Sequence, residues 1–231
     1  EVTSYSEGEF KNLFVDHEEI AAKIGSGKSD NNKSTKVVSG RKISVLPANK
    51  RTITNRQFGF MVGDEIDSYT PALRSSFLDQ ARVRGRTLGS DRKVGMASHP
   101  DAGWTSGISL GWTESSRGIY VWPCAECGMH SSPFPTRFWP DVPRMNLVYD
   151  DAGEGADRTE RIAMAKKTAA MMCPHCGALL DDSQRHEMID LGIWLHQGQT
   201  FDATLGVCGE IDDNPARGFW IHGTMSKMVG V

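Results

Sequence analysis

The sequence predicts an α/β protein whose first half forms part of a parallel sheet and whose second half is built around four cysteines. Three observations carry this prediction. Short apolar stretches alternate with helical patterns in the first half, which is typical of parallel strands joined by helices. One apolar stretch ends directly in two carboxylates, Asp64 and Glu65. Two Cys-x-x-Cys-Gly pairs in the second half have the spacing of metal ligands.

The composition is that of a soluble globular protein. The chain has 231 residues, of which 39% are hydrophobic and 24% charged, close to the usual averages. Its net charge of −3 excludes a generic polyanion binder, so a nucleic-acid contact requires a local basic patch. No apolar run approaches the roughly 20 residues of a membrane span, and the start lacks the features of a signal peptide. We therefore expect an intracellular protein with no membrane partner.

Hydrophobic periodicity gives the expected elements of the first half. Helices are expected over residues 9–24 and, opened by a proline, over residues 71–84. Residues 25–36 are polar and glycine-rich, which predicts an exposed loop. The apolar run at residues 58–63 predicts a strand buried on both faces. The other expected elements are strands within residues 41–48 and 93–97 and a turn over residues 98–107.

The character of the sequence changes from about residue 119, and a three-part division follows. We expect part of an α/β domain over residues 1–118, a cysteine-bearing unit with an inserted helix over residues 119–182, and a closing segment over residues 183–231. The remaining expected elements are helices over residues 158–172 and 183–190 and short strands at residues 193–196 and 219–222.

The cysteine pairs are the most specific signal in the sequence. The first pair is Cys124 and Cys127, the second is Cys173 and Cys176, and a glycine follows each pair. This glycine lets the backbone curl so that its amides face the sulfurs. Four thiolates make a closed tetrahedral site of the structural zinc type, although iron is accepted as well. Four unrelated free cysteines are the less favoured alternative.

The remaining candidate ligands are given other roles. His130 and His175 are possible substitute ligands, but we expect both to be solvent-facing residues of the two turns. Cys208 stands alone and is expected to be a small buried hydrophobic residue.

The strand that ends in Asp64 and Glu65 matches the Walker B arrangement of nucleoside triphosphatases. Asp64 is placed to bind Mg²⁺, directly or through water, and Glu65 to orient and polarise the water that attacks the γ-phosphate of ATP. An ordinary buried strand that meets an acidic turn gives the same pattern, and this alternative stays open. The fold class then becomes a P-loop NTPase-like partial parallel sheet, its Walker B half, with a four-cysteine zinc-ribbon unit.

Two further segments bear on the nucleotide site. Ser98-His99-Pro100 also follows an apolar strand and is placed like the motif that senses the nucleotide in ATP-driven motors, although a simple turn explains it equally well. Residues 25–29 imitate a phosphate loop, but the position five before Gly27 is Ala22 and no apolar strand precedes them. We reject this segment as a Walker A motif.

Basic residues gather before the Asp64-Glu65 strand. Nine Lys or Arg lie between residues 23 and 56, against the single acidic residue Asp30. The run predicts either a DNA-facing surface or a solvated loop, and the loop is favoured. Arg82, Arg84 and Arg86 are candidates for an arginine finger, but a solvated helix face explains them better and none is assigned.

In this order, the segments resemble the large terminase subunit of lambda-type tailed phages, the GpA family. The resemblance runs from about Gly40 to Gly223 and includes the Asp-Glu-x-Asp-x-Tyr strand end, the Ser98-His-Pro-Asp-Ala-Gly turn, both cysteine pairs and Arg217-Gly-Phe-Trp-Ile-His. The chain departs from the family where Ser98-His99-Pro100 replaces the usual Ser-Thr-Pro and where the interval between the cysteine pairs is longer.

The resemblance implies an ATPase that couples ATP hydrolysis to translocation of double-stranded viral DNA into the prohead, within a parent enzyme that also cuts concatemeric DNA as an endonuclease. It implies structural Zn²⁺, Mg²⁺ with ATP, and a homo-oligomeric motor. The implied partners are the small terminase subunit and the portal protein, in the host cytoplasm. The Walker A loop is expected before Glu1 and the nuclease carboxylates after Val231. The isolated chain is therefore expected to be inactive.

Two alternatives remain. One is a non-catalytic zinc-binding interaction module of a defective prophage. The other is a helicase-like ATPase of the Asp-Glu-x-Asp type, which shares the strand-end carboxylates and a serine-containing motif downstream. The cysteine pair directly after the coupling motif and the Arg217-Gly-Phe segment favour the terminase.

Overall fold

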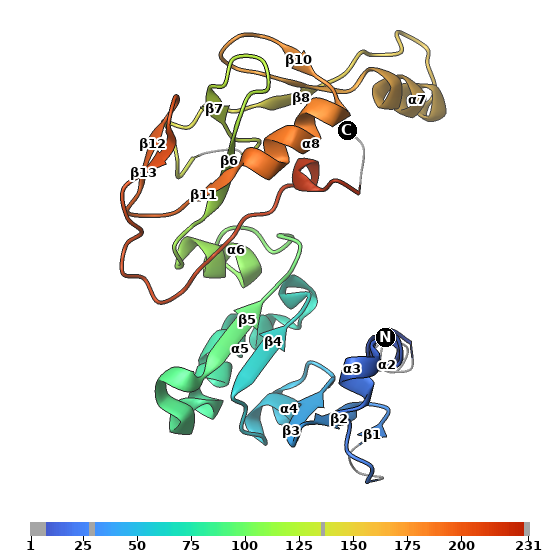
Figure 1. Ribbon diagram of the computed structural model, residues 1–231, viewed down its shortest axis with the longest axis vertical. Helices are drawn as coiled ribbons and strands as arrows, with labels where there is room; N and C mark the ends of the chain where they lie inside the picture. Colours follow the sequence, from blue (N-terminus) through green and yellow to red (C-terminus); the bar gives the residue numbers. More distant parts are fainter. Residues whose placement is uncertain (1–7, 28–30, 135–136, 229–231) are drawn as a thin grey trace. The chain divides into compact units, whose positions relative to one another are not determined.

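The computed structural model describes residues 8–27, 31–134 and 137–228, and the chain divides into two compact units (Figure 1). Unit 1 comprises residues up to 102 together with residues 106–108, and unit 2 comprises residues 103–105 and the chain from residue 109 onward. Within the described ranges, no helix combines the length and the apolar character needed to cross a membrane. Lys28 and Ser29, in the segment rejected as a phosphate loop, lie outside the described residues.

Unit 1 begins with two short helices and an antiparallel sheet. The helices are α2 (Glu9–Val15) and α3 (Glu18–Ala21), and the sheet has the order β1 (Asn31–Asn32), β2 (Thr35–Val38), β3 (Arg41–Ser44). The expected single helix over residues 9–24 is therefore interrupted at Asp16, which ends α2. The loop expected over residues 25–36 is wrong at its described end, where Thr35 and Lys36 are buried. The Lys36 ammonium is satisfied there, because it donates to Asn31 Oδ1 (2.6 Å) and to the Asn32 carbonyl (2.9 Å).

The second part of unit 1 is a pair of strands with a long helix on one face. Its elements are α4 (Lys50–Thr54), β4 (Phe60–Gly63), the 3₁₀ turn η1 (Ile66–Ser68), α5 (Pro71–Arg84), the 3₁₀ segment η2 (Arg86–Asp91) and β5 (Lys93–Met96). Ile53, Ile66, Leu73 and Phe77 are buried together as the core of this part. The bounds of α5 agree with the prediction, since Pro71 fixes the first turn of the helix.

Strand β4 differs from the prediction on one face. β4 and β5 are parallel neighbours, with Phe60 opposite Lys93 and Gly63 opposite Met96. Met61 packs against the core, whereas Phe60 and Val62 are 66% and 57% exposed. Burial on both faces is therefore not found, because the described part of the chain covers only one face. β4 and β5 are also the only parallel pair of named strands among the described residues. The predicted largely parallel sheet is therefore not found there, and the described fold is a mixed α/β fold with small sheets.

Unit 2 contains three small antiparallel sheets. The first has the order β11 (Ile193–Leu195), β6 (Ile119–Pro123), β7 (His130–Ser131). The second has the order β10 (Leu179–Leu180), β9 (Ala170–Met172), β8 (Asn146–Val148), and the third pairs β12 (Thr200–Asp202) with β13 (Gly206–Cys208). The other described elements are α6 (Gly107–Thr113), which begins in unit 1, α7 (Arg158–Thr168), α8 (Asp182–Leu191) and η3 (Gly223–Met225).

An aromatic core joins the first sheet of unit 2 to the end of the chain. Its buried members are Trp112, Ile119, Val121, Phe134, Val142 and Leu195. Trp220 packs against them with its ring 4.6 Å from that of Phe134. The strand expected over residues 219–222 is not formed, because Phe219 makes only an isolated bridge with Gly118.

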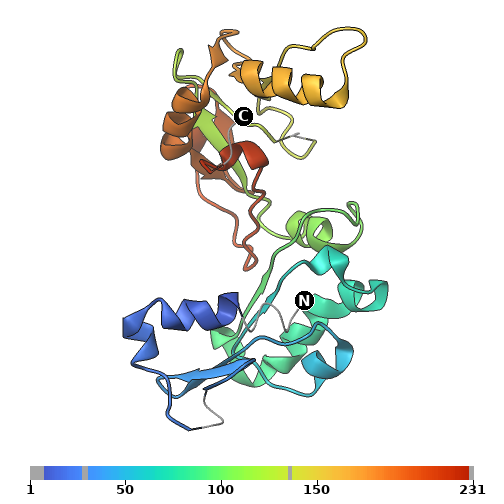
Figure 2. The same cartoon turned by 90° about the vertical axis from the view of Figure 1, so that its right-hand side faces the viewer.

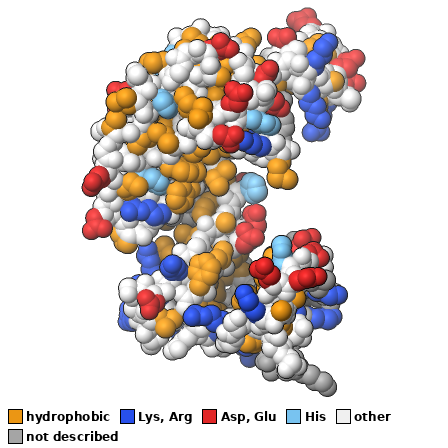
Figure 3. Space-filling model, in the orientation of Figure 1, with side chains coloured by type: hydrophobic (Ala, Val, Ile, Leu, Met, Phe, Trp, Pro, Cys, Tyr) orange, Lys and Arg blue, Asp and Glu red, His pale blue; other side chains and the backbone are white. Residues whose placement is uncertain are grey.

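Helix α7 is an arm inserted between β8 and β9. It is shorter than the expected helix over residues 158–172, because Ala170–Met172 form β9. Asp157 starts the helix in a capping box with Glu160, and no residue of the helix is buried. The arm stands away from the rest of unit 2 in both ribbon views (Figures 1 and 2). In the space-filling view, acidic and basic side chains are prominent on this arm (Figure 3).

Candidate functional site

Both cysteine pairs lie in the tight turn of a β-hairpin. The first pair lies between β6 and β7, and the second pair between β9 and β10. The glycines after the pairs, Gly128 and Gly177, have φ angles of 72° and 73°. Their amides donate to the carbonyl oxygens of Cys124 (2.8 Å) and Cys173 (3.0 Å). The predicted curl of the backbone at the two glycines is confirmed, because both adopt the left-handed conformation that is open to glycine without steric cost.

The four sulfur atoms form a compact group. All four lie within 4.8 Å of one another. The Sγ atoms of Cys124 and Cys176 are 3.9 Å apart and those of Cys127 and Cys173 are 3.8 Å apart, so all are free thiols. A tetrahedral ion with zinc–sulfur bonds of about 2.3 Å separates its sulfurs by about 3.8 Å. The residues present therefore fit a tetrahedral metal ion held by four thiolates.

Backbone amides and burial act on these sulfurs in opposite directions. The amide of Glu126 donates to Cys124 Sγ and that of His175 to Cys173 Sγ, each over 3.4 Å. Burial raises the pKa of the Cys124 thiol to about 12. Burial also acts to raise the pKa of Cys173, but backbone amides and the neighbouring cysteines bring it below its usual value. A cation at the centre would favour the thiolate form of all four, because metal-bound thiols are deprotonated.

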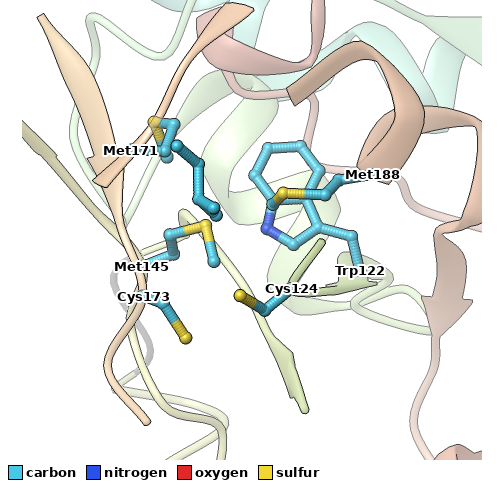
Figure 4. Close-up of a cluster of buried hydrophobic side chains, with 7 residues drawn as sticks. Trp122, Cys124, Met145, Met171, Cys173 and Met188 are labelled. Atoms are coloured by element: carbon cyan, nitrogen blue, oxygen red, sulfur yellow. The ribbon is translucent and has the colours of Figure 1, made fainter. Parts of the chain in front are cut away.

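The group spans from the core of unit 2 to its surface. Cys124 and Cys173 are 2% and 1% exposed, whereas Cys127 and Cys176 are exposed. The two buried cysteines belong to a core that also contains Trp122, Met145, Met171, Leu180 and Met188 (Figure 4). A metal ion would thus connect two hairpins whose buried side chains share one apolar core.

The other candidate ligands lie outside the sulfur group. His175 is exposed, as expected, and its Nε2 is 2.9 Å from the His130 carbonyl oxygen. His130 is half-buried rather than solvent-facing, because its amide pairs with the Ala203 carbonyl (2.6 Å) next to the third sheet. Cys208 is half-buried on β13, more exposed than predicted.

The candidate nucleotide-side carboxylates lie at the carboxyl end of β4. Glu65 has a left-handed backbone (φ 50°, ψ 47°), a conformation that is costly for a residue with a Cβ and that gathers at functional sites. Its amide donates to Asp64 Oδ1 (3.1 Å), and both residues are exposed. In the described ranges no further His, Cys, Asp or Glu joins them into a metal cluster. Mg²⁺ bound here would need phosphate and water oxygens to complete its coordination.

The candidate coupling segment lies beside these carboxylates. The Ala97 amide donates to the Gly63 carbonyl (2.9 Å), so β5 ends level with β4. His99 Nδ1 is then 3.4 Å from Glu65 Oε1. The parallel pairing therefore brings the two motifs to one edge of the sheet, while the chemical roles of Asp64, Glu65 and His99 stay predictions.

Asp67 is a site residue to which the sequence analysis gave no role. It closes the Asp-Glu-x-Asp motif, is 8% exposed, and accepts hydrogen bonds from the amides of Ala102 and Ile108. The sequence signal was its place in the motif. Its partners follow it by 35 and 41 residues, and no local pattern predicts such a pairing.

The basic run is partly structured. Residues 31–63 contain seven Lys or Arg and no Asp or Glu, and they form β1, β2, β3, α4 and β4 rather than a loop. Arg41, Lys42, Lys50 and Arg51 are exposed. Lys and Arg side chains (blue) are visible on this part of the chain in Figure 3. Exposed Lys and Arg side chains are what a contact with a nucleic-acid backbone requires, and such a contact of this segment stays a prediction.

Comparison with known proteins matches the chain to a family. The family model described as the phage terminase large subunit gpA, ATPase domain, matches residues 1–194. No curated protein and no solved structure matches the chain.

Proposed function

The chain belongs to the phage terminase large subunit family of the gpA type, in its ATPase domain, and from this premise we propose that it is part of a DNA-packaging motor that couples ATP hydrolysis to translocation of double-stranded viral DNA. The observation that carries the proposal beyond family membership is the edge of the β4–β5 pair. There a strained Glu65, just after an apolar strand, has its Oε1 atom 3.4 Å from Nδ1 of His99, which lies in the loop after the neighbouring strand β5. Acidic and polar groups on adjacent strand ends are the arrangement that hydrolysis and its sensing require.

Each residue of this edge has a proposed role. Asp64 would hold Mg²⁺, and the ion would neutralise negative charge on the phosphates of ATP. Glu65 orients the attacking water and accepts its proton as the water oxygen bonds to the γ-phosphorus. The products are then ADP and inorganic phosphate. The chain contains no G-x-x-x-x-G-K-[S/T] sequence, so we expect the chain by itself to hydrolyse ATP poorly.

The rest of the proposal concerns the parent protein. The four cysteines would hold a structural zinc ion and stiffen the unit that follows the ATPase edge. We propose that the chain consists of part of the ATPase domain over residues 1–118, the zinc-ribbon unit over residues 119–182 and the end of the ATPase region over residues 183–231. We further propose that the parent is a DNA-cutting endonuclease that acts as a homo-oligomer with the small terminase subunit and the portal protein, in the host cytoplasm. These features rest on the family alone.

The proposal is tested on the complete large subunit by measuring DNA-stimulated ATP hydrolysis. Glu65→Gln keeps the size of the side chain and removes the proton acceptor, so the turnover number is expected to fall by about 100-fold or more while ATP still binds. Glu210→Gln makes the same change on an exposed residue of unit 2 and is expected to keep the wild-type rate.

The outcomes separate the alternatives. A Glu65→Gln protein as active as wild type would refute the role of Glu65. A complete wild-type protein that binds zinc but hydrolyses no ATP would identify the non-catalytic interaction module instead. ATP-dependent strand separation, without uptake of duplex DNA into proheads, would identify the helicase-like ATPase.

A further inference from the structure

Asp67 lies where the turn after β4 meets the loop after β5. Its carboxylate is buried and accepts two backbone amides, Oδ2 from Ala102 (2.8 Å) and Oδ1 from Ile108 (2.7 Å). Such short bonds to a carboxylate are among the stronger hydrogen bonds in proteins. A single side chain therefore ties the middle and the end of the loop over residues 98–108 to the turn that carries the Asp-Glu-x-Asp motif.

The backbone of Asp67 adds a link to the beginning of the same loop. Its amide donates to Ser98 Oγ (3.0 Å), and its carbonyl accepts from Arg74 Nη1 (2.8 Å). Arg74 Nε in turn donates to Ser106 Oγ (3.0 Å). The loop is thus held at Ser98, Ala102, Ser106 and Ile108, and each link leads to Asp67 directly or through Arg74.

Gly107 shows how closely the loop approaches the carboxylate. Its φ angle is 61°, and a Cβ at this position would lie 2.0 Å from Asp67 Oδ1 and 2.7 Å from Asp67 Cγ. Only glycine permits this approach. The packing leaves no room for the loop to shift toward Asp67, so a displacement of the turn displaces the loop as well.

The loop leads from the candidate hydrolysis edge into unit 2. Glu65 lies two residues before Asp67, and Ser98 directly precedes His99, whose ring contacts Glu65. At the other end, Ile108 lies in α6, which begins in unit 1 and continues into unit 2. The Asp67 network therefore links the turn after β4 to Ser98 and to the first residues of α6.

We propose that Asp67 is a positioning residue that transmits the state of the hydrolysis edge to the loop over residues 98–108 and so couples ATP hydrolysis to DNA movement. It does not touch the nucleotide. It keeps Ser98 and His99 in register with Glu65 and pulls the start of α6 along with the turn. This inference rests on the proposed function, since coupling has a meaning only in a motor.

The test is Asp67→Asn in the complete terminase, with linear duplex DNA, empty proheads and ATP. An amide keeps one accepting oxygen and turns its NH₂ group toward a backbone N–H, so one of the two loop bonds is lost. Two quantities are measured, the turnover of ATP and the length of DNA packaged per ATP hydrolysed. We expect the packaged length per ATP to fall by about tenfold with a much smaller change in turnover. Asp79→Asn, on an 82% exposed side chain of α5, is the matched control and leaves both quantities unchanged.

A second variant keeps the inference testable if Asp67→Asn does not fold. Ser98→Ala leaves the carboxylate intact and removes the hydroxyl that accepts from the Asp67 amide and donates to the His99 carbonyl (3.0 Å), so a partial loss of packaging per ATP is expected. The inference is overturned if a folded Asp67→Asn protein, or Ser98→Ala where the first does not fold, keeps the wild-type ratio of DNA to ATP. It is also overturned if turnover and packaging fall in proportion, since Asp67 would then serve hydrolysis alone. These results differ from failure of the proposed function, in which the wild-type protein itself hydrolyses no ATP.

Discussion

Replacement of Cys127 by serine is expected to release the bound metal and to unfold the part of unit 2 around it. Cys127 is exposed, whereas Cys124 and Cys173 belong to the core. The substitution at Cys127 therefore removes a ligand with little loss of apolar burial, and its effect reports on the metal alone. The same change at Cys124 would add a packing cost to the loss of the metal.

The expected magnitude follows from two free energies. A structural zinc ion in small zinc domains contributes about 10–16 kcal/mol of apparent binding free energy near neutral pH. A whole domain is stable by about 5–15 kcal/mol. The free energy lost with the metal is thus as large as the free energy of unfolding of unit 2. We expect the apolar core beside the metal site to lose its cooperative unfolding transition; its members include Trp122, Met145, Met171 and Met188. Unit 1 has its own core and should keep its transition.

The assay can observe unit 2 selectively, because all six tryptophans lie in it. Elemental analysis gives the metal content per chain, and tryptophan fluorescence follows the thermal melt with and without a chelator. Cys208→Ser makes the same substitution outside the sulfur group and should keep both the metal and the melt. The double variant Cys127→Ser/Cys176→Ser should have almost the same melting temperature as Cys127→Ser alone, because the first substitution already releases the single ion that both cysteines would bind. A Cys127→Ser protein that retains metal and melts like Cys208→Ser would refute the four-thiolate site.

Further expectations concern a histidine, a glycine and a pair of phenylalanines. Burial of the His196 ring, and to a smaller extent the charge of Arg217, lower the pKa of this histidine in the folded protein. The neutral ring therefore contributes fully to the free energy of unfolding above about pH 6.5, the usual pKa of histidine. This contribution is lost as the pH falls through the lower folded-state pKa. Melts between pH 5 and 8 should show this loss in wild type and not in His196→Asn. Gly107→Ala should destabilise unit 1, by urea unfolding, more than Gly40→Ala, which lies in the same unit. At Gly40 φ is 75° but no atom lies within 4 Å of the added Cβ, so the cost is about 1–2 kcal/mol. Phe77→Ala should cost about 3–5 kcal/mol and Phe60→Ala under about 1 kcal/mol; equal costs would contradict the exposure of Phe60.

The features that the sequence predicted well are those set by local chemistry. A cysteine pair followed by glycine specifies its own turn, and both turns form with matching geometry. The start of α5 is set by Pro71, and α8 begins at the capping box of Asp181 and Gln184, within one residue of the prediction. In these cases the partners lie within a few residues of each other, so the pattern contains the whole interaction.

The features that escaped prediction depend on partners far away in the chain. In the sequence Asp67 is one of several acidic residues, and only the fold brings the amides of Ala102 and Ile108 to its carboxylate as hydrogen-bond donors. Lys36 has the sequence context of a loop residue, but in the structure it lies on β2 and its ammonium group donates to Asn31 and Asn32 of β1. In each case a polar side chain is buried because a tertiary partner satisfies it, and composition contains no information about that partner.

The disagreement at β4 has a physical reason of its own. An unbroken apolar strand is favoured where both faces of a sheet are covered, because parallel strands carry helices on either side. The described residues cover the face of Met61 with α5 and leave Phe60 and Val62 in solvent. Two large apolar side chains held exposed on a rigid strand lose the stabilisation that their burial would give, roughly 1.5–3 kcal/mol each. The strand that leads into Asp64 and Glu65 therefore has a sequence suited to a second covered face, and the stability of the β4–β5 pair should rise whenever that face is buried.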